Sequence, residues 1–236
     1  MLSYKKVHKK GSQHLMDYLF FDIECADGYN ICAFGYVITD YNFNVLLKED
    51  IKINPKKKVL MEGRRPTDDF HLGYTDTDLV NEQVFSDKYQ KIKNLLENHN
   101  YIVIGHSVDS DSKFLRNACK ESKLRYIKFK ALDIQKIFKF WKKSSQQSAL
   151  KNIGIELGVD FNEENHTGLS GAILTMECFK ALRCKIGFDA IAMLDDKKYT
   201  TNSIPEIKHK KEKRFHSSYT IGEVFSKISN ELNKEA

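Results

Sequence analysis

Two carboxylate residues, Asp22 and Glu24, interrupt an apolar run near the start of the chain. The run over residues 18–25 has the composition of a buried strand, and residues two apart on a strand point to the same face. Two adjacent carboxylates in that setting repel each other and lose hydration unless cations or protons neutralise them. A divalent metal site would satisfy both requirements. The alternative is that Asp22 lies at an exposed strand end and is solvated.

Two later segments also carry residues that could do chemistry. Asp111 falls in the first turn of a helix expected after the strand over 101–106, at the sheet edge where open α/β sheets bind ligands. His166 lies in a loop before another expected helix, and an ordinary imidazole pKa of about 6.5 makes it eligible as a base. Each has a plainer explanation. The helix dipole and capping favour acids such as Asp109 and Asp111 in a first turn, and a lone histidine is often a surface residue.

The elements that must position these residues alternate along the chain. Period-two and helical patterns predict strands over 18–25, 31–39, 44–53, 101–106 and 126–132. They predict helices over 76–98, 107–122, 134–141 and 148–157, with a core helix from about residue 167. Ser148 is the expected cap of the helix over 148–157, and Gly158 its expected end. Three strands followed by alternating helices and strands indicate an α/β fold with a mixed sheet.

Composition limits the class of protein. With 236 residues and 41% hydrophobic content, the chain fits one domain over 16–186, with a basic extension over 1–15 and a basic linker and helix over 187–236. The net charge of +6 permits a polyanionic partner without requiring one. Five scattered cysteines suggest neither a disulfide framework nor structural zinc, and no segment approaches the roughly 20 apolar residues of a membrane span. A soluble, cytoplasmic protein is expected.

Taken in order, the three chemical segments resemble the motifs of the DnaQ-like, or DEDDh, 3′–5′ exonuclease family, which includes the proofreading subunit of bacterial DNA polymerase III and ribonuclease T. The run over 20–24 matches an apolar strand that ends in Asp-x-Glu. Positions that match the second and third motifs are His106, Asp111, Phe114, Leu115, His166 and Ala172. Weaker agreements lie at 132–133 and 149–158. The resemblance covers residues 16–183 and implies an RNase H-like mixed sheet flanked by helices.

The resemblance also implies an activity, which is hydrolysis at the 3′ ends of single-stranded DNA or RNA with two Mg²⁺ or Mn²⁺ ions. In that scheme Asp22 bridges both ions, Glu24 assists one, and Asp111 supports the other. His166 takes the proton from the attacking water. The implied substrate contacts are Cys25, Ala26, His106 and Phe114. A polymerase or another protein is a further implied partner, and a membrane is not.

The sequence departs from the family at Gly171, where a fourth acidic ligand is expected. Glu177 does not replace it, because six helical positions rotate a side chain roughly 240° away. A carboxylate at 171 would face Asp22, so weak or absent activity is predicted for this chain, and Gly171→Asp is expected to restore hydrolysis. Two alternatives stay open. One is a catalytically dead domain that binds nucleic-acid ends or a protein partner, and the other is an RNase H-like scaffold for protein assembly alone.

Overall fold

The structure is a computed structural model that describes residues 16–60, 72–161 and 166–205. The chain divides into two compact units, Met1–Pro205 and Glu206–Ala236, and every described residue belongs to the first. The predicted extension over 1–15 and the predicted helix near the C-terminus therefore lie outside the described residues.

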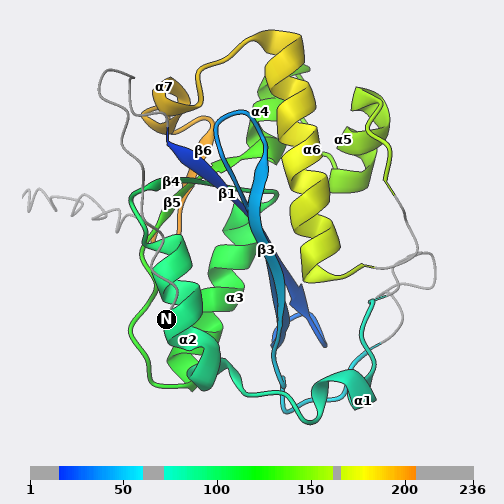
Figure 1. Ribbon diagram of the computed structural model, residues 1–236, viewed down its shortest axis with the longest axis vertical. Helices are drawn as coiled ribbons and strands as arrows, with labels where there is room; N and C mark the ends of the chain where they lie inside the picture. The colour runs from blue at the N-terminus through cyan, green and yellow to red at the C-terminus, as the bar shows by residue number, and fades with distance from the viewer. Residues whose placement is uncertain (1–15, 61–71, 162–165, 206–236) are drawn as a thin grey trace, which may run out of the picture. The chain divides into compact units, whose positions relative to one another are not determined.

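A six-stranded mixed sheet in the order β3-β2-β1-β4-β5-β6 forms the centre of the first unit (Figure 1). The predicted antiparallel meander is confirmed and consists of β1 (Asp17–Cys25), β2 (Ile31–Thr39) and β3 (Val45–Lys52). On the other side of β1 come the parallel strands β4 (Tyr101–Gly105) and β5 (Lys130–Asp133), and then the short antiparallel β6 (Thr200–Asn202).

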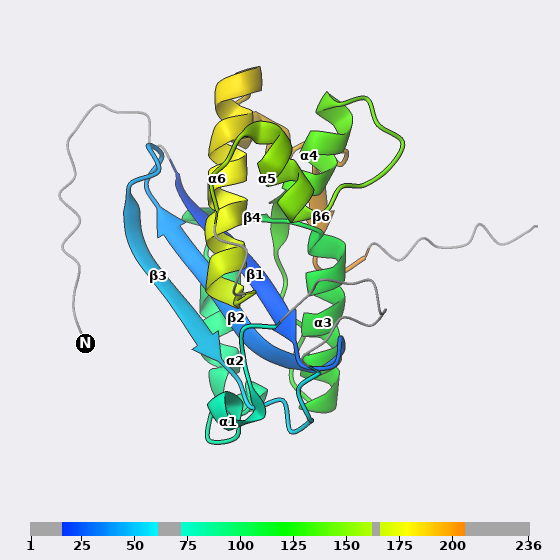
Figure 2. The same ribbon diagram turned by 90° about the vertical axis from the view of Figure 1, so that its right-hand side faces the viewer.

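Helices cover both faces of this sheet. They are α1 (Asp76–Leu79), α2 (Phe85–Leu96), α3 (Val108–Glu121), α4 (Ile134–Trp141), α5 (Leu150–Leu157), α6 (Gly168–Ile186) and α7 (Ala190–Leu194). The long helix α6 lies across β1 and β2, as Figures 1 and 2 show from two directions. The helices α2 and α3 contribute to a core on the opposite face. Mixed-sheet architecture with flanking helices is what the element order predicted.

The side chains of β1 alternate between two cores. Leu19, Phe21 and Ile23 belong to the core that includes α2 and α3. Tyr18 and Phe20 belong to the core under α6. Because this alternation has a period of two, Asp22 and Glu24 continue the face that α6 covers. The predicted same-face placement of the two carboxylates is thus confirmed.

Several boundaries differ from the sequence prediction for local reasons. The helix predicted over 76–98 is split into α1 and α2, because the intervening chain bonds to Asn54 through the carbonyl of Gln83 and a bridge at Val84. The helix α5 is capped by Ala149 and not by Ser148, whose carbonyl instead contacts the ring of His106 at 2.9 Å. Residues 187–205, assigned to a linker from the sequence, contain α7 and β6.

Candidate active site

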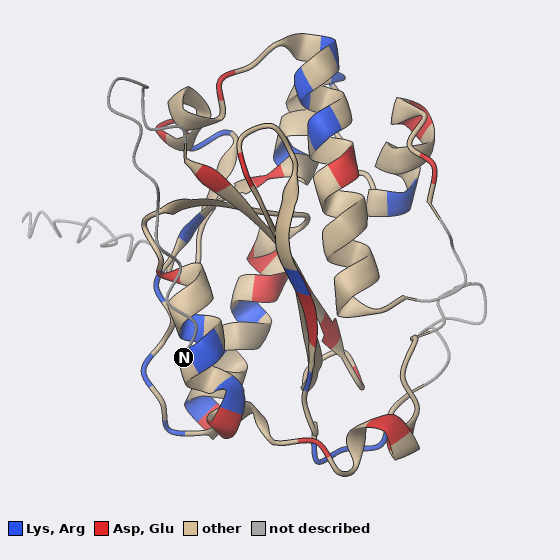
Figure 3. Ribbon diagram, viewed as in Figure 1, with Lys and Arg blue, Asp and Glu red and all other residues tan. Residues whose placement is uncertain are grey.

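A cleft of about 460 Å³ lies beside the carboxylates of β1, between that strand and the helices α5 and α6. Its polar lining consists of Asp22, Glu24, His106, Lys151, Asp160, His166, Thr167, Ser170 and Glu177. The structure therefore brings three of the four predicted catalytic residues, Asp22, Glu24 and His166, to one cleft. Figure 3 shows acidic segments on β1 and β3 beside the lower turns of α6, which carry no charged residue.

The fourth predicted residue, Asp111, lies behind this cleft in the first turn of α3. That helix begins after Ser107, which has the left-handed φ of 56°. The carboxylate of Asp133, at the end of β5, accepts hydrogen bonds from the N–H groups of Ser107 at 3.2 Å and Val108 at 3.1 Å. Asp109 does not cap this helix, contrary to expectation, because it points outward and pairs with Lys136 at 3.1 Å.

Asp111 itself is buried, with 5% of its surface exposed. Its Oδ2 atom is buried without a hydrogen-bond partner among the residues that the structure describes. Burial raises the pKa of the Asp111 carboxyl well above its usual range, and the nearby carboxyls of Asp22, Asp133 and Glu24 raise it further. A buried carboxyl oxygen left without a donor is costly unless a proton or a cation satisfies it.

The carboxyls of Asp22 and Glu24 influence each other. Burial raises the pKa of Asp22 to about 7, and burial together with the charge of Asp22 raises the pKa of Glu24 to about 9. Both shifts favour the protonated carboxyls when no cation is present.

The fit of these residues to a metal is only partial. Carboxylate oxygens are the ligands that Mg²⁺ and Mn²⁺ prefer, and the unpartnered oxygen of Asp111 is a donor of that kind. Across residues 16–60, 72–161 and 166–205, however, no three carboxyl, imidazole or thiol side chains converge closely enough to hold an ion. With glycine at 171, the donor set also lacks the fourth carboxylate of a two-ion centre.

Hydrogen bonds hold the backbone on both sides of His166, although this residue precedes a helix. Its carbonyl accepts a hydrogen bond from the N–H of Gly73 at 2.8 Å, and a parallel bridge joins it to Leu72. On the other side, Thr167 and Ser170 form a reciprocal capping box at the start of α6, with bonds of 3.1 and 2.9 Å. The backbone of His166 is therefore fixed relative to α6.

The residues expected to contact substrate are dispersed. His106 lines the cleft, and burial lowers its pKa, which favours the neutral imidazole. Cys25 and Phe114 are partly buried against the core that includes α2 and α3. Ala26 is buried in a third, smaller cluster. Of these four residues, His106 alone belongs to the lining of the cleft.

Position 171 faces Asp22, as the helical register predicted. The approach is closer than a side chain permits. A Cβ atom built on Gly171 would lie 2.2 Å from Oδ2 of Asp22, 2.6 Å from its Cγ and 3.0 Å from its Cβ. The carboxyl group of Asp22 thus lies in the space that a fourth acidic side chain would enter.

Sequence reasoning missed two residues that hold the start of α6. The Tyr74 hydroxyl donates to Oδ2 of Asp50 at 2.7 Å and accepts from the N–H of Gly168 at 2.8 Å. Oδ1 of Asp50 accepts from the N–H of Leu169 at 3.2 Å. Asp50 lies on β3 and Tyr74 lies just before α1, so no sequence spacing links either residue to α6. The one signal in the sequence was Asp50, a charged residue on a strand beside the core.

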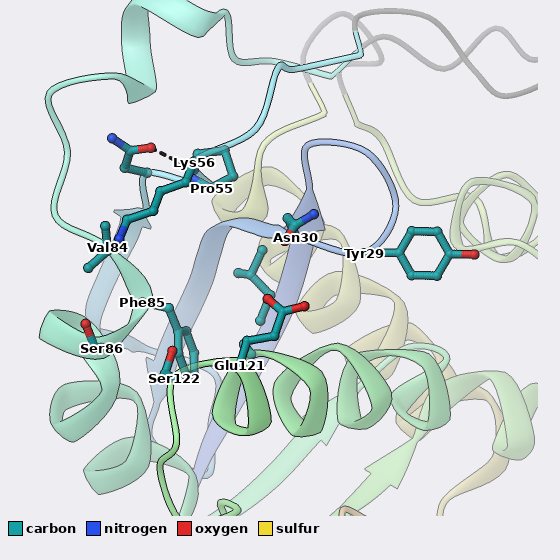
Figure 4. Close-up of a pocket in the computed structure, with 12 residues that line it drawn as sticks. Tyr29, Asn30, Pro55, Lys56, Val84, Phe85, Ser86, Glu121 and Ser122 are labelled. Atoms are coloured by element: carbon teal, nitrogen blue, oxygen red, sulfur yellow. Dashed lines mark hydrogen bonds between the residues drawn. The ribbon is translucent and has the colours of Figure 1, made fainter.

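A second hollow, of about 300 Å³, lies near the start of α2 and the end of α3 (Figure 4). Its charged lining residues, Lys56 and Glu121, are exposed and opposite in sign. Figure 4 shows the ring of Tyr29 directed away from this hollow. None of the predicted chemical residues lines it, and the cleft beside Asp22 is the candidate site.

Comparison with known proteins agrees with this geometry. A profile of the DNA polymerase III subunit epsilon-like C-terminal domain of DEDDh proteins matches residues 69–182, a segment that includes Asp111, His166 and Gly171. Over these residues the chain is similar to the DnaQ-like, or DEDDh, family, in agreement with the resemblance noted in the sequence. The predicted RNase H-like fold is confirmed by solved structures. No curated protein sequence matches the chain.

Among the similar structures is a full-length 3′-exonuclease, with 20% identity and a TM-score of 0.59 over 77% of this chain and 64% of that one. The nuclease domain of 3′hExo, a DEDDh family member bound to rAMP, has 20% identity and a TM-score of 0.57 over 81% and 98% of the two chains. Exonuclease X in complex with 5′ overhanging duplex DNA has 10% identity and a TM-score of 0.54 over 76% and 97%. This chain therefore spans less than two thirds of the length of the full-length 3′-exonuclease.

Within the described part of the chain, no helix is long and apolar enough to cross a membrane.

Proposed function

We propose that this chain is a metal-dependent 3′–5′ exonuclease of low activity on single-stranded DNA or RNA ends. The observation that carries the proposal is the meeting of Asp22, Glu24 and His166 at one cleft, with the buried carboxyl of Asp111 directly behind. Similarity to the DEDDh family over residues 69–182 supports the reaction class. Related structures hold rAMP in one case and duplex DNA with a 5′ overhang in another, so both kinds of nucleic acid stay within the proposal.

The charge of the cleft explains why a cation would be needed. Four carboxylic residues line it, Asp22, Glu24, Asp160 and Glu177, against one lysine, Lys151. A phosphodiester entering such a cleft meets repulsion unless positive charge is added. Asp22 and Glu24 would hold a divalent cation, with Asp111 as a further carboxylate. When bound, such an ion neutralises these groups and stabilises charge on the phosphoryl oxygens.

The protein residues have separate tasks in this proposal. Asp22 and Glu24, whose pKa values are raised, would be deprotonated when they hold a cation. His166 would accept the proton of the attacking water, since its backbone is fixed at the cleft by Gly73 and by the cap of α6. Asp133 would act indirectly by holding the first turn of α3, and with it Asp111.

Oligonucleotides with a free or a blocked 3′ end, labelled at the 5′ end, test the proposal in the presence of Mn²⁺. We expect stepwise shortening of the free end alone, and its loss in Asp22→Ala and Asp111→Asn. Asp109→Asn is the matched control, because Asp109 is an exposed acid two residues from Asp111 that pairs with Lys136. Equal shortening by wild type and Asp22→Ala would exclude the proposed site.

A second function is favoured by the contact between position 171 and Asp22. In that reading the domain binds nucleic-acid ends or a protein partner and cuts nothing. Binding of a 5′-labelled single strand by wild type, with no shortening under Mn²⁺ or Mg²⁺ at high enzyme concentration, would select this function over the first.

A further inference from the structure

Three residues in register form a row across the meander. Asp22 on β1 is paired with Gly35 on β2, and Gly35 is paired with Asp50 on β3. Directly paired residues of neighbouring strands point to the same face. The row thus presents two carboxylates to α6 with a gap between them, because Gly35 has no side chain.

The first turn of α6 fills that gap. A Cβ atom on Gly35 would lie 1.8 Å from the carbonyl carbon of Gly168, and one on Gly168 would lie 2.6 Å from the backbone nitrogen of Gly35. The contact joins two backbones, so neither Gly35 nor Gly168 can relieve it by changing a side-chain rotamer. The helix approaches β2 more closely than any residue pair other than glycine with glycine would permit.

Hydrogen bonds fasten the helix in this place. Asp50 and Tyr74 together satisfy the N–H groups of Gly168 and Leu169, which a helix start otherwise leaves without partners. Tyr74 is 2% exposed, so its hydroxyl is held inside the packing. One turn further along, the same approach brings Gly171 against Asp22.

We infer that the fixed height of α6 above β1 and β2 leaves room for one carboxylate at this point, so that Gly171 is part of the packing and the residues present do not fit a two-ion centre. This rests on the proposed function as far as cation binding is concerned. The inference goes beyond the proposed function because it gives Gly171 a role in packing. Gly35, Gly168, Asp50 and Tyr74 hold α6 at a height that leaves no space for a side chain at position 171. Gly171→Asp alone would then displace Asp22 instead of completing a two-ion centre, contrary to the expectation from the sequence.

The stoichiometry of Mn²⁺ binding tests the cation count, with bound ion measured from the loss of the free Mn²⁺ electron paramagnetic resonance signal. We expect at most one ion per wild-type chain and no second ion in Gly171→Asp. Two ions on wild type, or a second ion gained by Gly171→Asp, would overturn the inference while leaving the proposed function standing. If wild type binds no Mn²⁺ at all, the proposed function fails and the inference that two ions do not fit stands.

Thermal unfolding of wild type and Gly171→Ala tests the packing without any metal. Alanine inside a helix normally stabilises relative to glycine. Here we expect the melting temperature to fall, by roughly several degrees for a domain of this size. Lys180→Ala on the exposed face of the same helix is the control and should change it little. An unchanged or higher melting temperature for Gly171→Ala would overturn the packing argument. Should Gly171→Ala fail to fold, the wild-type stoichiometry still decides the number of ions.

Discussion

The carboxyl oxygen Oδ2 of Asp22 lies 2.2 Å from the point where a side chain on Gly171 would begin. In a site that used a fourth acidic ligand, that side chain and Asp22 would have to stand apart with an ion between them. Here Asp22 fills the space itself, and burial raises its pKa to about 7. The distance between α6 and β1 therefore determines whether a fourth carboxylate fits beside Asp22.

A double-mutant cycle measures this contact. Asp22→Ala removes Oδ2 and Cγ, the two atoms nearest a Cβ at position 171. Gly171→Asp should therefore destabilise the wild-type background more than the Asp22→Ala background, with an interaction free energy of about 1 kcal/mol or more. Urea unfolding of the four proteins provides the measurement. Additive effects would show that the two positions do not compete for space.

The pH dependence of stability follows from the raised pKa values of Asp22 and Glu24. In the unfolded chain both carboxyls titrate at about 4, so above that pH the folded protein binds more protons than the unfolded one. The metal-free free energy of unfolding should then fall as the pH rises from about 4 through the folded pKa values of about 7 and about 9. Glu24→Gln should lose part of that fall. Identical pH profiles of wild type and Glu24→Gln, measured by denaturant unfolding in a chelator, would contradict the assignment.

Tyr74→Phe should loosen the start of α6. The substitution removes one hydroxyl and leaves both the Gly168 N–H and Oδ2 of Asp50 without this partner, at a cost of about 1–3 kcal/mol. Tyr126→Phe is the control, because Tyr126 is 43% exposed. Hydrogen exchange at Gly168 and Leu169 should speed up in Tyr74→Phe and stay unchanged in Tyr126→Phe. Unaltered exchange in both variants would show that the Tyr74 hydroxyl does not hold the start of α6.

Binding to single strands should depend on salt, and part of that dependence should come from the basic run over 208–214. The first compact unit ends at Pro205, and β6 pairs with β5 over 200–202, so a truncation that leaves this unit intact must follow residue 205. Deleting 206–236 should weaken binding and reduce the slope of log K against log salt without lowering the melting temperature. A slope that stays the same would assign the segment another role.

Much of the site was predictable because it depends on local periodicity. The alternation in β1 placed Asp22 and Glu24 on one face, and the helical register of α6 directed position 171 toward Asp22. The distance at which it does so was not predictable, since it depends on Gly35, which is 136 positions before Gly171 in the chain. The same holds for Asp50 and Tyr74, whose bonds to α6 exist only in the folded chain. The cap of α3 by Asp133, and not by Asp109, is a further contact between distant segments.

The most direct test of the account is anomalous diffraction at the manganese edge from crystals soaked with Mn²⁺ and adenosine monophosphate. We expect one manganese peak in the cleft, in contact with Asp22 and Glu24, with the phosphate of the nucleotide beside it. The same soak of Asp22→Ala crystals should show no peak. Two manganese peaks on either side of Asp22 would contradict the inference that two ions do not fit, and an empty cleft at saturating Mn²⁺ would contradict the proposed exonuclease.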